Sequence, residues 1–107
     1  EKLMADCQAV VEAGAAILLL ECVPAELAKK VRDTFSVPVI GIGAGVECDG
    51  QVLVMHDMLG VYTRKPAKFV KDFLTDEHNE TKDITGAFKA YHQAVKDRTF
   101  PTPAHSF

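Results

Sequence analysis

The sequence predicts an α/β protein built on a parallel sheet, and two observations lead to this prediction. Two short apolar runs, residues 16–20 and 39–42, are unbroken by polar residues. Unbroken runs are typical of strands that are covered on both faces, as in parallel sheets. Segments with helical spacing alternate with these runs, which indicates strand–helix–strand units. A third strand is predicted at residues 51–55.

Three longer segments repeat their apolar residues at intervals of three and four, which predicts amphipathic helices. The first ends near Gly14, a residue that suits a helix C-terminus, and the second begins at Pro24, which is tolerated in a first helical turn. The apolar stripes are, in chain order, Leu3, Met4, Cys7, Val10 and Val11; Leu27, Ala28, Val31 and Phe35; and Ile84, Ala87, Phe88, Tyr91 and Val95. Shorter helices are predicted at residues 56–59 and from Pro66, the latter with the apolar face Phe69, Val70, Phe73 and Leu74.

The number of strands sets the expected architecture. Three parallel strands do not close a sheet, and a (β/α)8 barrel typically takes about 250 residues, whereas this chain has 107. We therefore expect residues 1–107 to form the C-terminal part of a single (β/α)8 TIM-type barrel domain, beginning inside a longer protein. By itself such a segment would have open strand edges and an uncovered apolar face. Residues 75–82 (TDEHNETK) are expected to be a polar surface loop.

Composition and charge exclude several classes of protein. The net charge of −3 argues against nucleic acid or an anionic membrane surface as the main partner, since both favour basic patches. No apolar run approaches the roughly 20 residues of a membrane span, and no signal peptide is visible. The three cysteines, Cys7, Cys22 and Cys48, form no C-x-x-C motif. Their odd number predicts reduced thiols in a cytoplasmic protein rather than a disulfide scaffold or a structural zinc site.

Glu21 is the strongest candidate for a catalytic residue. It directly follows Leu18-Leu19-Leu20, so it lies at the C-terminal end of a buried strand, and this end of the strands forms the active-site mouth of α/β barrels. Partial burial there would raise the pKa of the carboxyl group and make it a better base near neutral pH. The alternative is a carboxylate that caps the following helix. Position alone does not decide between these two roles.

The remaining candidates are weaker. The glycines of residues 41–45 (GIGAG) could receive an anion on free N–H groups, or they could simply make a tight, closely packed turn. His56 and Asp57 are adjacent, so their side chains do not face each other and structural roles are favoured. The other histidines, His78, His92 and His105, show no metal-ligand spacing. Solvated helix faces or ends are expected for Asp6, Glu12, Glu26, Asp33, Asp72 and Asp76.

Several motifs, in this order along the chain, resemble the ketopantoate hydroxymethyltransferase family. They are L-E-C-V-P at residues 20–24, P-V-I-G-I-G-A-G at 38–45, D-G-Q-V-L-V-M-H-D at 49–57, P-A-K-F at 66–69 and H-S-F at 105–107. Any one of them is weak, but the ordered set is specific and covers almost the whole chain. The polar segment 75–82 is longer than the family pattern, and Cys48 replaces a small polar residue.

The resemblance implies a reaction and a role for one residue. Members of this family transfer a hydroxymethyl group from 5,10-methylenetetrahydrofolate to 2-oxoisovalerate (3-methyl-2-oxobutanoate), with the help of Mg²⁺, in pantothenate biosynthesis. The glutamate of the L-E-C-V-P motif, Glu21 here, corresponds to the proton acceptor. The family's metal ligands and most contacts with the 2-oxo acid correspond to the part of the barrel before this chain. The resemblance also implies a homo-oligomer, a decamer, and an inactive isolated chain.

Two other functions stay open from the sequence. One is a related Mg²⁺-dependent lyase or mutase that acts on another 2-oxo acid on a similar barrel. The other is a non-catalytic half-barrel that serves as an assembly module, which the apolar strands and open edges would permit.

Overall fold

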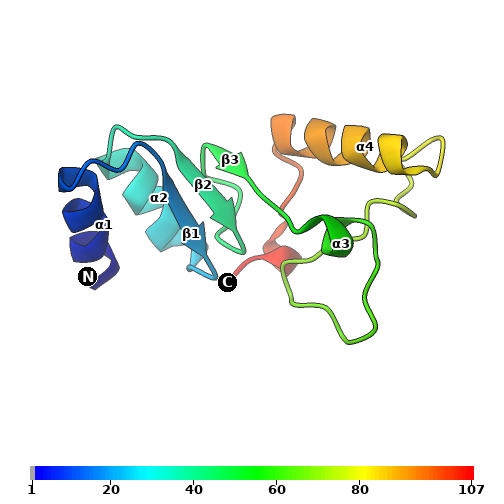
Figure 1. The fold of residues 1–107 in the computed structure, drawn as a ribbon, viewed down its shortest axis with the longest axis horizontal. Helices are drawn as coiled ribbons and strands as arrows, with labels where there is room; N and C mark the ends of the chain where they lie inside the picture. Colours follow the sequence, from blue (N-terminus) through cyan, green and yellow to red (C-terminus); the bar gives the residue numbers. More distant parts are fainter. Residues whose placement is uncertain (1) are drawn as a thin grey trace.

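The computed structural model describes residues 2–107, which form an α/β fold around a parallel sheet of three strands (Figure 1). The elements are, in chain order, α1 (Lys2–Glu12), β1 (Leu18–Glu21), α2 (Ala25–Thr34), β2 (Val39–Ile42), β3 (Gly50–Gln51), α3 (Met55–Met58), α4 (Ile84–Lys96) and a 3₁₀ turn, Pro103–His105. The strands lie in the order β1-β2-β3, and both pairs are parallel. The α/β class with a parallel sheet is therefore confirmed, and three strands leave that sheet open.

One face of β1 is buried and the other is exposed. In β1 the buried residues Leu18 and Leu20 alternate with the exposed residues Leu19 and Glu21. The buried face packs against α1, which precedes β1, and against α2, which follows it. Ala28 and Val31 of α2 are fully buried there. On the opposite face Leu19 is 57% exposed. The uncovered apolar face that three strands predict is therefore present at β1 only, because Ile42, which pairs with Glu21, is buried.

The long amphipathic helices are confirmed as α1, α2 and α4, and the short one near His56 as α3. Gly14 follows α1 with a φ of 110°, as expected for a residue that ends a helix. Pro24 occupies the N-cap of α2 rather than its first turn. The N-cap of α4 is Asp83, whose carboxylate accepts a hydrogen bond of 2.7 Å from the Gly86 N–H. No helix in residues 2–107 is both long and apolar enough to cross a membrane.

The prediction of a third strand over residues 51–55 is wrong in length. Strand β3 has two residues, Gly50–Gln51, although the Val52 N–H still donates to the Gly41 carbonyl at 3.0 Å. Beyond that point β3 has no partner to pair with, because the chain of β2 turns away at Gly43, where φ is 65°. Val54 is consequently 54% exposed, and the apolar run continues without strand pairing.

The helix predicted from Pro66 does not form, because its apolar residues pack in different parts of the molecule. The Phe73 N–H donates to the Met58 carbonyl at 2.7 Å instead of to a carbonyl one helical turn earlier. The Asp72 carboxylate accepts from the Leu74 N–H at 2.8 Å, a local bond that competes with helix formation. Phe73 is buried in a second core, whereas Phe69 lies against Gly43. Tertiary contacts thus override a helical pattern of only nine residues.

The second core lies to one side of the sheet, beyond β3, and α4 packs on it (Figure 1). Phe73 is at its centre and packs edge-on against Tyr91 and Phe100, with ring centroids 5.3 Å away in both cases. The Tyr91 hydroxyl is buried and has no hydrogen-bond partner among residues 2–107. Loss of solvation raises the pKa of Tyr91 to about 12. The buried members of this core are Met58, Phe73, Ala87, Ala90 and Phe100.

Candidate functional site

Glu21 is the last residue of β1, as the sequence predicts, and it lies on the open face of the sheet. It pairs in register with Ile42, the last residue of β2, so both stand at the carboxyl edge of the sheet. The Glu21 side chain is exposed and makes no hydrogen bond or ion pair with any residue in 2–107. The alternative role in capping is not observed, because the N-cap of α2 is Pro24 and α2 has no side-chain cap. Partial burial of Glu21 is likewise not seen within this chain.

The backbone after Glu21 turns sharply while it stays bonded to β2. Cys22 has a φ of 56°, a left-handed conformation that non-glycine residues seldom adopt. Its N–H donates to the Ile42 carbonyl at 3.0 Å, and the next N–H, that of Val23, donates to the Gly43 carbonyl at 3.1 Å. These two bonds extend the contact between β1 and β2 beyond Glu21. The backbone that carries the candidate base is therefore bonded to the β2 chain both before and after Glu21.

The glycine cluster after β2 is explained by turning and close packing. Gly43 and Gly45 have φ values of 65° and 85°, which favour glycine. A β-carbon on Gly45 would lie 2.6 Å from the Ala25 β-carbon at the start of α2. One on Gly43 would lie 2.8 Å from the Phe69 ring and 3.2 Å from the Phe107 ring. Of the two interpretations left open by the sequence, the tight and closely packed turn accounts for the geometry.

Two aromatic side chains from distant parts of the sequence meet at Gly43. Phe69 and Phe107 lie against it, and the Lys68 ammonium is 5.2 Å from the centre of the Phe107 ring. The Phe107 carbonyl accepts a hydrogen bond of 3.2 Å from the Ala25 N–H, which ties the tail to the start of α2. Figure 1 shows the end of the chain beside the tip of β1. The sequence did not predict this meeting, because it joins segments that lie far apart along the chain.

The other predicted candidates do not join this edge as a catalytic set. His56 is exposed in α3, and His92 is exposed on α4. His78 contacts Asp76 in the segment before α4. Cys7, Cys22 and Cys48 are free thiols, and burial raises the pKa of Cys7 and Cys48. Within residues 2–107 no three His, Cys, Asp or Glu side chains gather closely enough to hold a metal ion.

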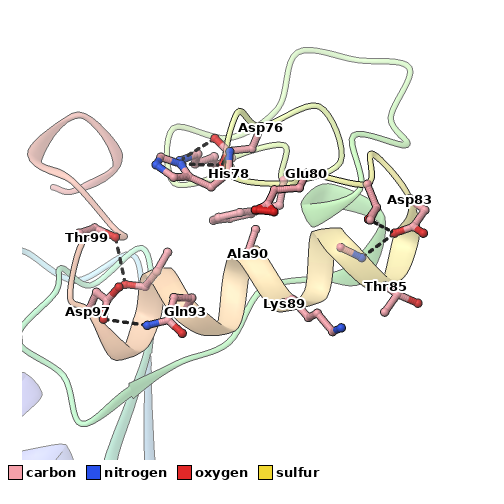
Figure 2. Close-up of a pocket in the computed structure, with 15 residues that line it drawn as sticks. Asp76, His78, Glu80, Asp83, Thr85, Lys89, Ala90, Gln93, Asp97 and Thr99 are labelled. Carbon is pink, nitrogen blue, oxygen red and sulfur yellow. Dashed lines mark hydrogen bonds and ion pairs between the residues drawn. The ribbon is translucent and has the colours of Figure 1, made fainter.

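A groove of about 950 Å³ lies elsewhere, between α4 and the segment that precedes it (Figure 2). Figure 2 shows Asp76 and His78 on the loop side, with Ala90 and Gln93 on the helix. Every residue that lines it belongs to 71–99, so the carboxyl edge of the sheet does not contribute. Acidic and basic side chains are mixed along the groove, and they point to no single chemistry. We therefore place the candidate site at Glu21 and the carboxyl edge.

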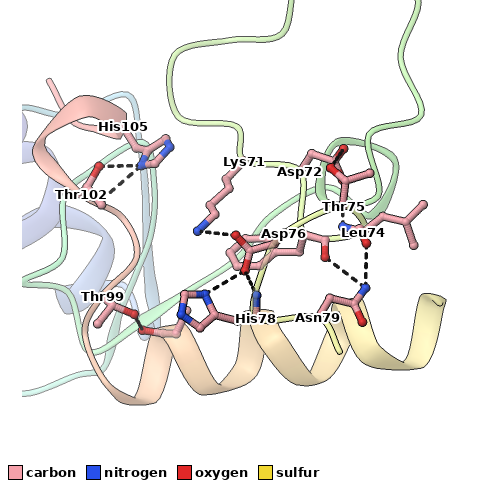
Figure 3. Close-up of polar contacts among 12 residues, drawn as sticks. Lys71, Asp72, Leu74, Thr75, Asp76, His78, Asn79, Thr99, Thr102 and His105 are labelled. Carbon is pink, nitrogen blue, oxygen red and sulfur yellow. Dashed lines mark hydrogen bonds and ion pairs between the residues drawn. The ribbon is translucent and has the colours of Figure 1, made fainter. Parts of the chain in front are cut away.

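The segment 71–83 is held by polar contacts around two residues (Figure 3). Asn79 is 1% exposed, and its amide donates to the carbonyls of Phe73, Leu74 and Asp83 at 3.3, 2.8 and 3.2 Å. The Asp76 carboxylate contacts the Lys71 ammonium and the His78 ring, both at 3.1 Å. Segment 75–82 is therefore irregular, as expected, but it is folded around a buried side chain.

His105 fastens the tail that leads to Phe107 (Figure 3). Its Nδ1 accepts a hydrogen bond of 3.3 Å from the Thr102 N–H and lies 2.8 Å from the Thr102 hydroxyl. An acceptor Nδ1 requires the neutral ring. Partial burial, together with the nearby Lys71 charge, lowers the pKa of His105 and favours that neutral form. This contact positions Phe107 two residues later.

The family model and the similar proteins all point to the same enzyme family. A family model described as ketopantoate hydroxymethyltransferase matches residues 1–103. A protein of Psychrobacter cryohalolentis named 3-methyl-2-oxobutanoate hydroxymethyltransferase is 60% identical over 107 residues. Proteins with the same name from Acinetobacter baylyi and Neisseria gonorrhoeae are 58% and 56% identical. All of this chain is matched in these three alignments, but it spans only about 40% of each relative's length.

Proposed function

Because the chain belongs to the ketopantoate hydroxymethyltransferase family, we propose that it supplies the catalytic base of an enzyme that hydroxymethylates 2-oxoisovalerate. The observation that carries the proposal is the position of Glu21. Its carboxylate is exposed at the carboxyl edge of a parallel sheet and does not cap helix α2. In α/β barrels this edge forms the active site. The names of the relatives support the reaction.

The proposed role of Glu21 is to remove a proton from carbon 3 of the 2-oxo acid. The carboxylate oxygen takes this proton, and the electron pair of the broken C–H bond forms the enolate. Carbon 3 then bonds to the one-carbon unit of 5,10-methylenetetrahydrofolate. Over the whole reaction the two C–N bonds of this unit break, and its carbon gains one bond to carbon 3 and one bond to a water oxygen. The proton taken by Glu21 and one proton of the water pass to the two folate nitrogens, so that tetrahydrofolate and ketopantoate leave. A base fixed in position contributes about 10²- to 10⁴-fold to such a proton transfer.

The residues of this chain do not by themselves fit a Mg²⁺ ion, since no cluster of three potential ligands exists within 2–107. The proposal for this chain is accordingly confined to proton transfer and substrate binding. We further propose that ligands for Mg²⁺ come from the rest of the barrel and that the complete enzyme is a cytoplasmic homo-oligomer. Both points rest on the family resemblance alone.

Glu21→Gln tests the proposed base in a complete enzyme. The 107 residues replace the matching 40% of the P. cryohalolentis relative, which supplies the remaining length. Glutamine keeps the size of the side chain but does not accept the proton, so C3-proton exchange of 2-oxoisovalerate should fall by about 10²- to 10⁴-fold. Loss of the C3–H signal in D₂O, followed by NMR, measures this rate.

The matched control is Glu26→Gln, which changes another exposed glutamate in the first turn of α2. It should leave exchange within about twofold, the variation expected for a surface change that touches no substrate. Exchange at the normal rate in Glu21→Gln would show that a different residue is the base.

The isolated 107-residue chain is expected to be inactive. It holds the proposed base but lacks a set of metal ligands within residues 2–107, so it should bind Mg²⁺ weakly and form no ketopantoate. Calorimetric titration with Mg²⁺ and chromatography of the reaction mixture measure the two properties. Sustained hydroxymethyl transfer by this chain alone would overturn the division of the site between two parts of the barrel.

A further inference from the structure

A cationic and aromatic patch borders the proposed catalytic base. It consists of Phe69 and Phe107, which lie against Gly43, and of Lys68, whose ammonium lies over the Phe107 ring, and we call it the Gly43 patch. Gly43 directly follows Ile42, and Ile42 is the residue that pairs with Glu21. The patch therefore begins one residue beyond the base along the carboxyl edge. Phe107 is 48% exposed even though its ring lies against Gly43 and the Lys68 ammonium lies over it.

The charge of this region is opposite to that of the whole chain. The net charge is −3, yet the segment 64–71 (RKPAKFVK) carries four cationic residues and no acidic one. Lys71 is paired with Asp76. Arg64, Lys65 and Lys68 are exposed and have no ion pair among the residues that the structure describes. Unpaired cations next to an exposed ring favour a ligand that is both flat and anionic.

The contacts at Gly43 keep the rings in place. The absence of a side chain lets Phe69 and Phe107 approach the main chain, because a β-carbon there would be 2.8 Å from Phe69. The Phe107 carbonyl is bonded to the Ala25 N–H, and His105 is bonded to Thr102 two residues earlier. A ring that is held in this way loses little conformational freedom when a ligand stacks on it.

We propose that the Gly43 patch binds the one-carbon donor of the reaction, a reduced folate, and this inference rests on the proposed function. The exposed part of the Phe107 ring would stack on an aromatic ring of the donor, and Lys68, with the neighbouring cations, would bind the carboxylates of its glutamate tail. The 2-oxo acid has no aromatic ring, so Phe107 offers it little. A donor held here would lie next to the carbon that Glu21 deprotonates.

Phe107→Leu and Lys68→Gln test the patch in the complete enzyme described above. Leucine keeps apolar contact with Gly43 but removes the ring face, and glutamine removes the charge. Each change should raise the KM for 5,10-methylenetetrahydrofolate about five- to tenfold, as expected when one stacking or cationic contact is lost. C3-proton exchange of 2-oxoisovalerate, which needs no folate, should stay within about twofold.

The two contacts can be separated with a donor that lacks the glutamate tail. With 5,10-methylenetetrahydropteroate, Lys68→Gln should no longer raise KM, whereas Phe107→Leu should raise it as before. An equal effect of Lys68→Gln on both donors would overturn the assignment of Lys68 to the tail carboxylates.

Matched controls are Phe88→Leu and Lys30→Gln. Phe88 is an exposed phenylalanine on α4, and Lys30 is an exposed lysine on α2. Neither change should alter the KM for the donor. Equilibrium binding of tetrahydrofolate, measured by calorimetry, gives a second readout that does not require turnover, and Phe107→Leu should weaken it about five- to tenfold.

The outcomes distinguish the patch from the proposed function. Unchanged donor KM and unchanged tetrahydrofolate binding in both patch variants, with normal exchange, would overturn the patch and leave Glu21 as the base. Loss of exchange in Phe107→Leu equal to the loss of donor binding would assign the ring a structural role instead. Absence of C3 exchange in the unmutated enzyme would contradict the proposed function, whereas tetrahydrofolate binding would still test the patch.

Discussion

The two halves of the chain, residues 2–51 and residues 52–107, each have a buried core, but they are built differently. In the first half, the helices α1 and α2 and the strands β1 and β2 bury Leu18, Leu20 and Val31 through repeating patterns. In the second half, α4 is the one long helix, and single residues such as Met58, Phe73 and Phe100 reach the core from irregular segments.

This difference determines how structure follows from sequence in each half. A repeating stripe contains several residues that all favour the same helix or strand, so local pattern and final structure agree. In the irregular segments a single side chain or a single hydrogen bond determines the path of the main chain. Replacing a single anchor should therefore damage the second half more than the first.

Phe73→Ala should have the largest effect. Phe73 is 1% exposed and contacts two aromatic rings, so its loss should cost about 3–5 kcal/mol. Hydrogen exchange measured peptide by peptide in the complete enzyme should show lost protection in α4, with β1 and β2 unaffected. The matched change in the first half, Val31→Ala, should cost only about 2 kcal/mol. Equal damage to both halves from Phe73→Ala would mean that the two cores unfold as one unit.

Asn79→Asp should rank second. The side chain keeps its size, but a carboxylate oxygen would face the carbonyls of Phe73, Leu74 and Asp83 in place of the donor amide. A buried acceptor left against other acceptors costs about 2–3 kcal/mol, and a charge adds to this. Exchange should accelerate across residues 73–83 and the first turn of α4. Glu77→Gln, an exposed change between acid and amide in the same segment, should have no such effect.

Acid should have the smallest effect, again confined to the second half. Burial of Asp76 opposes its ionisation, but hydrogen bonds from the His78 N–H and the Lys71 ammonium outweigh it and hold the pKa below the ordinary value of 3.8. A lowered pKa contributes stability above the unfolded value, and this contribution is lost as pH falls through the folded one. Pepsin cleavage within residues 71–83 should therefore rise below about pH 4. The cleavage rate is corrected for the pH dependence of pepsin itself, measured on an unfolded peptide. After this correction, cleavage of Asp76→Asn should change less with pH than cleavage of the unmutated protein. Identical pH profiles for the two proteins would contradict this role of Asp76.

The sequence predictions succeeded where several residues supported the same element. Residues 39–42 form a strand with the predicted bounds, and α4 forms where its stripe predicts a helix. The face of α4 that is buried is shifted from that stripe, since Ala87 and Ala90 are buried whereas Ile84 and Phe88 are exposed. The predicted helix from Pro66 failed because Phe73 gains more from the second core than a short helix would gain from its own bonds. The third strand stopped early because its neighbour turns away at Gly43.

The candidate site was predictable only in part. The position of Glu21 followed from the end of an unbroken apolar run, and the structure places it at the end of β1. Its exposure did not follow, because that depends on which residues cover the open face of the sheet. The meeting of Phe69 and Phe107 at Gly43 depends on contacts between distant segments, which no local pattern encodes.

The left-handed residue Cys22 has a practical consequence for labelling. It is the exposed thiol of the three in this chain, whereas Cys7 and Cys48 are buried and their raised pKa values leave less reactive thiolate. A thiol-directed fluorophore would therefore attach next to Glu21 without any engineered cysteine in these residues. Its emission would respond when a molecule occupies the carboxyl edge, so the natural sequence already contains an attachment point for an optical sensor of that edge.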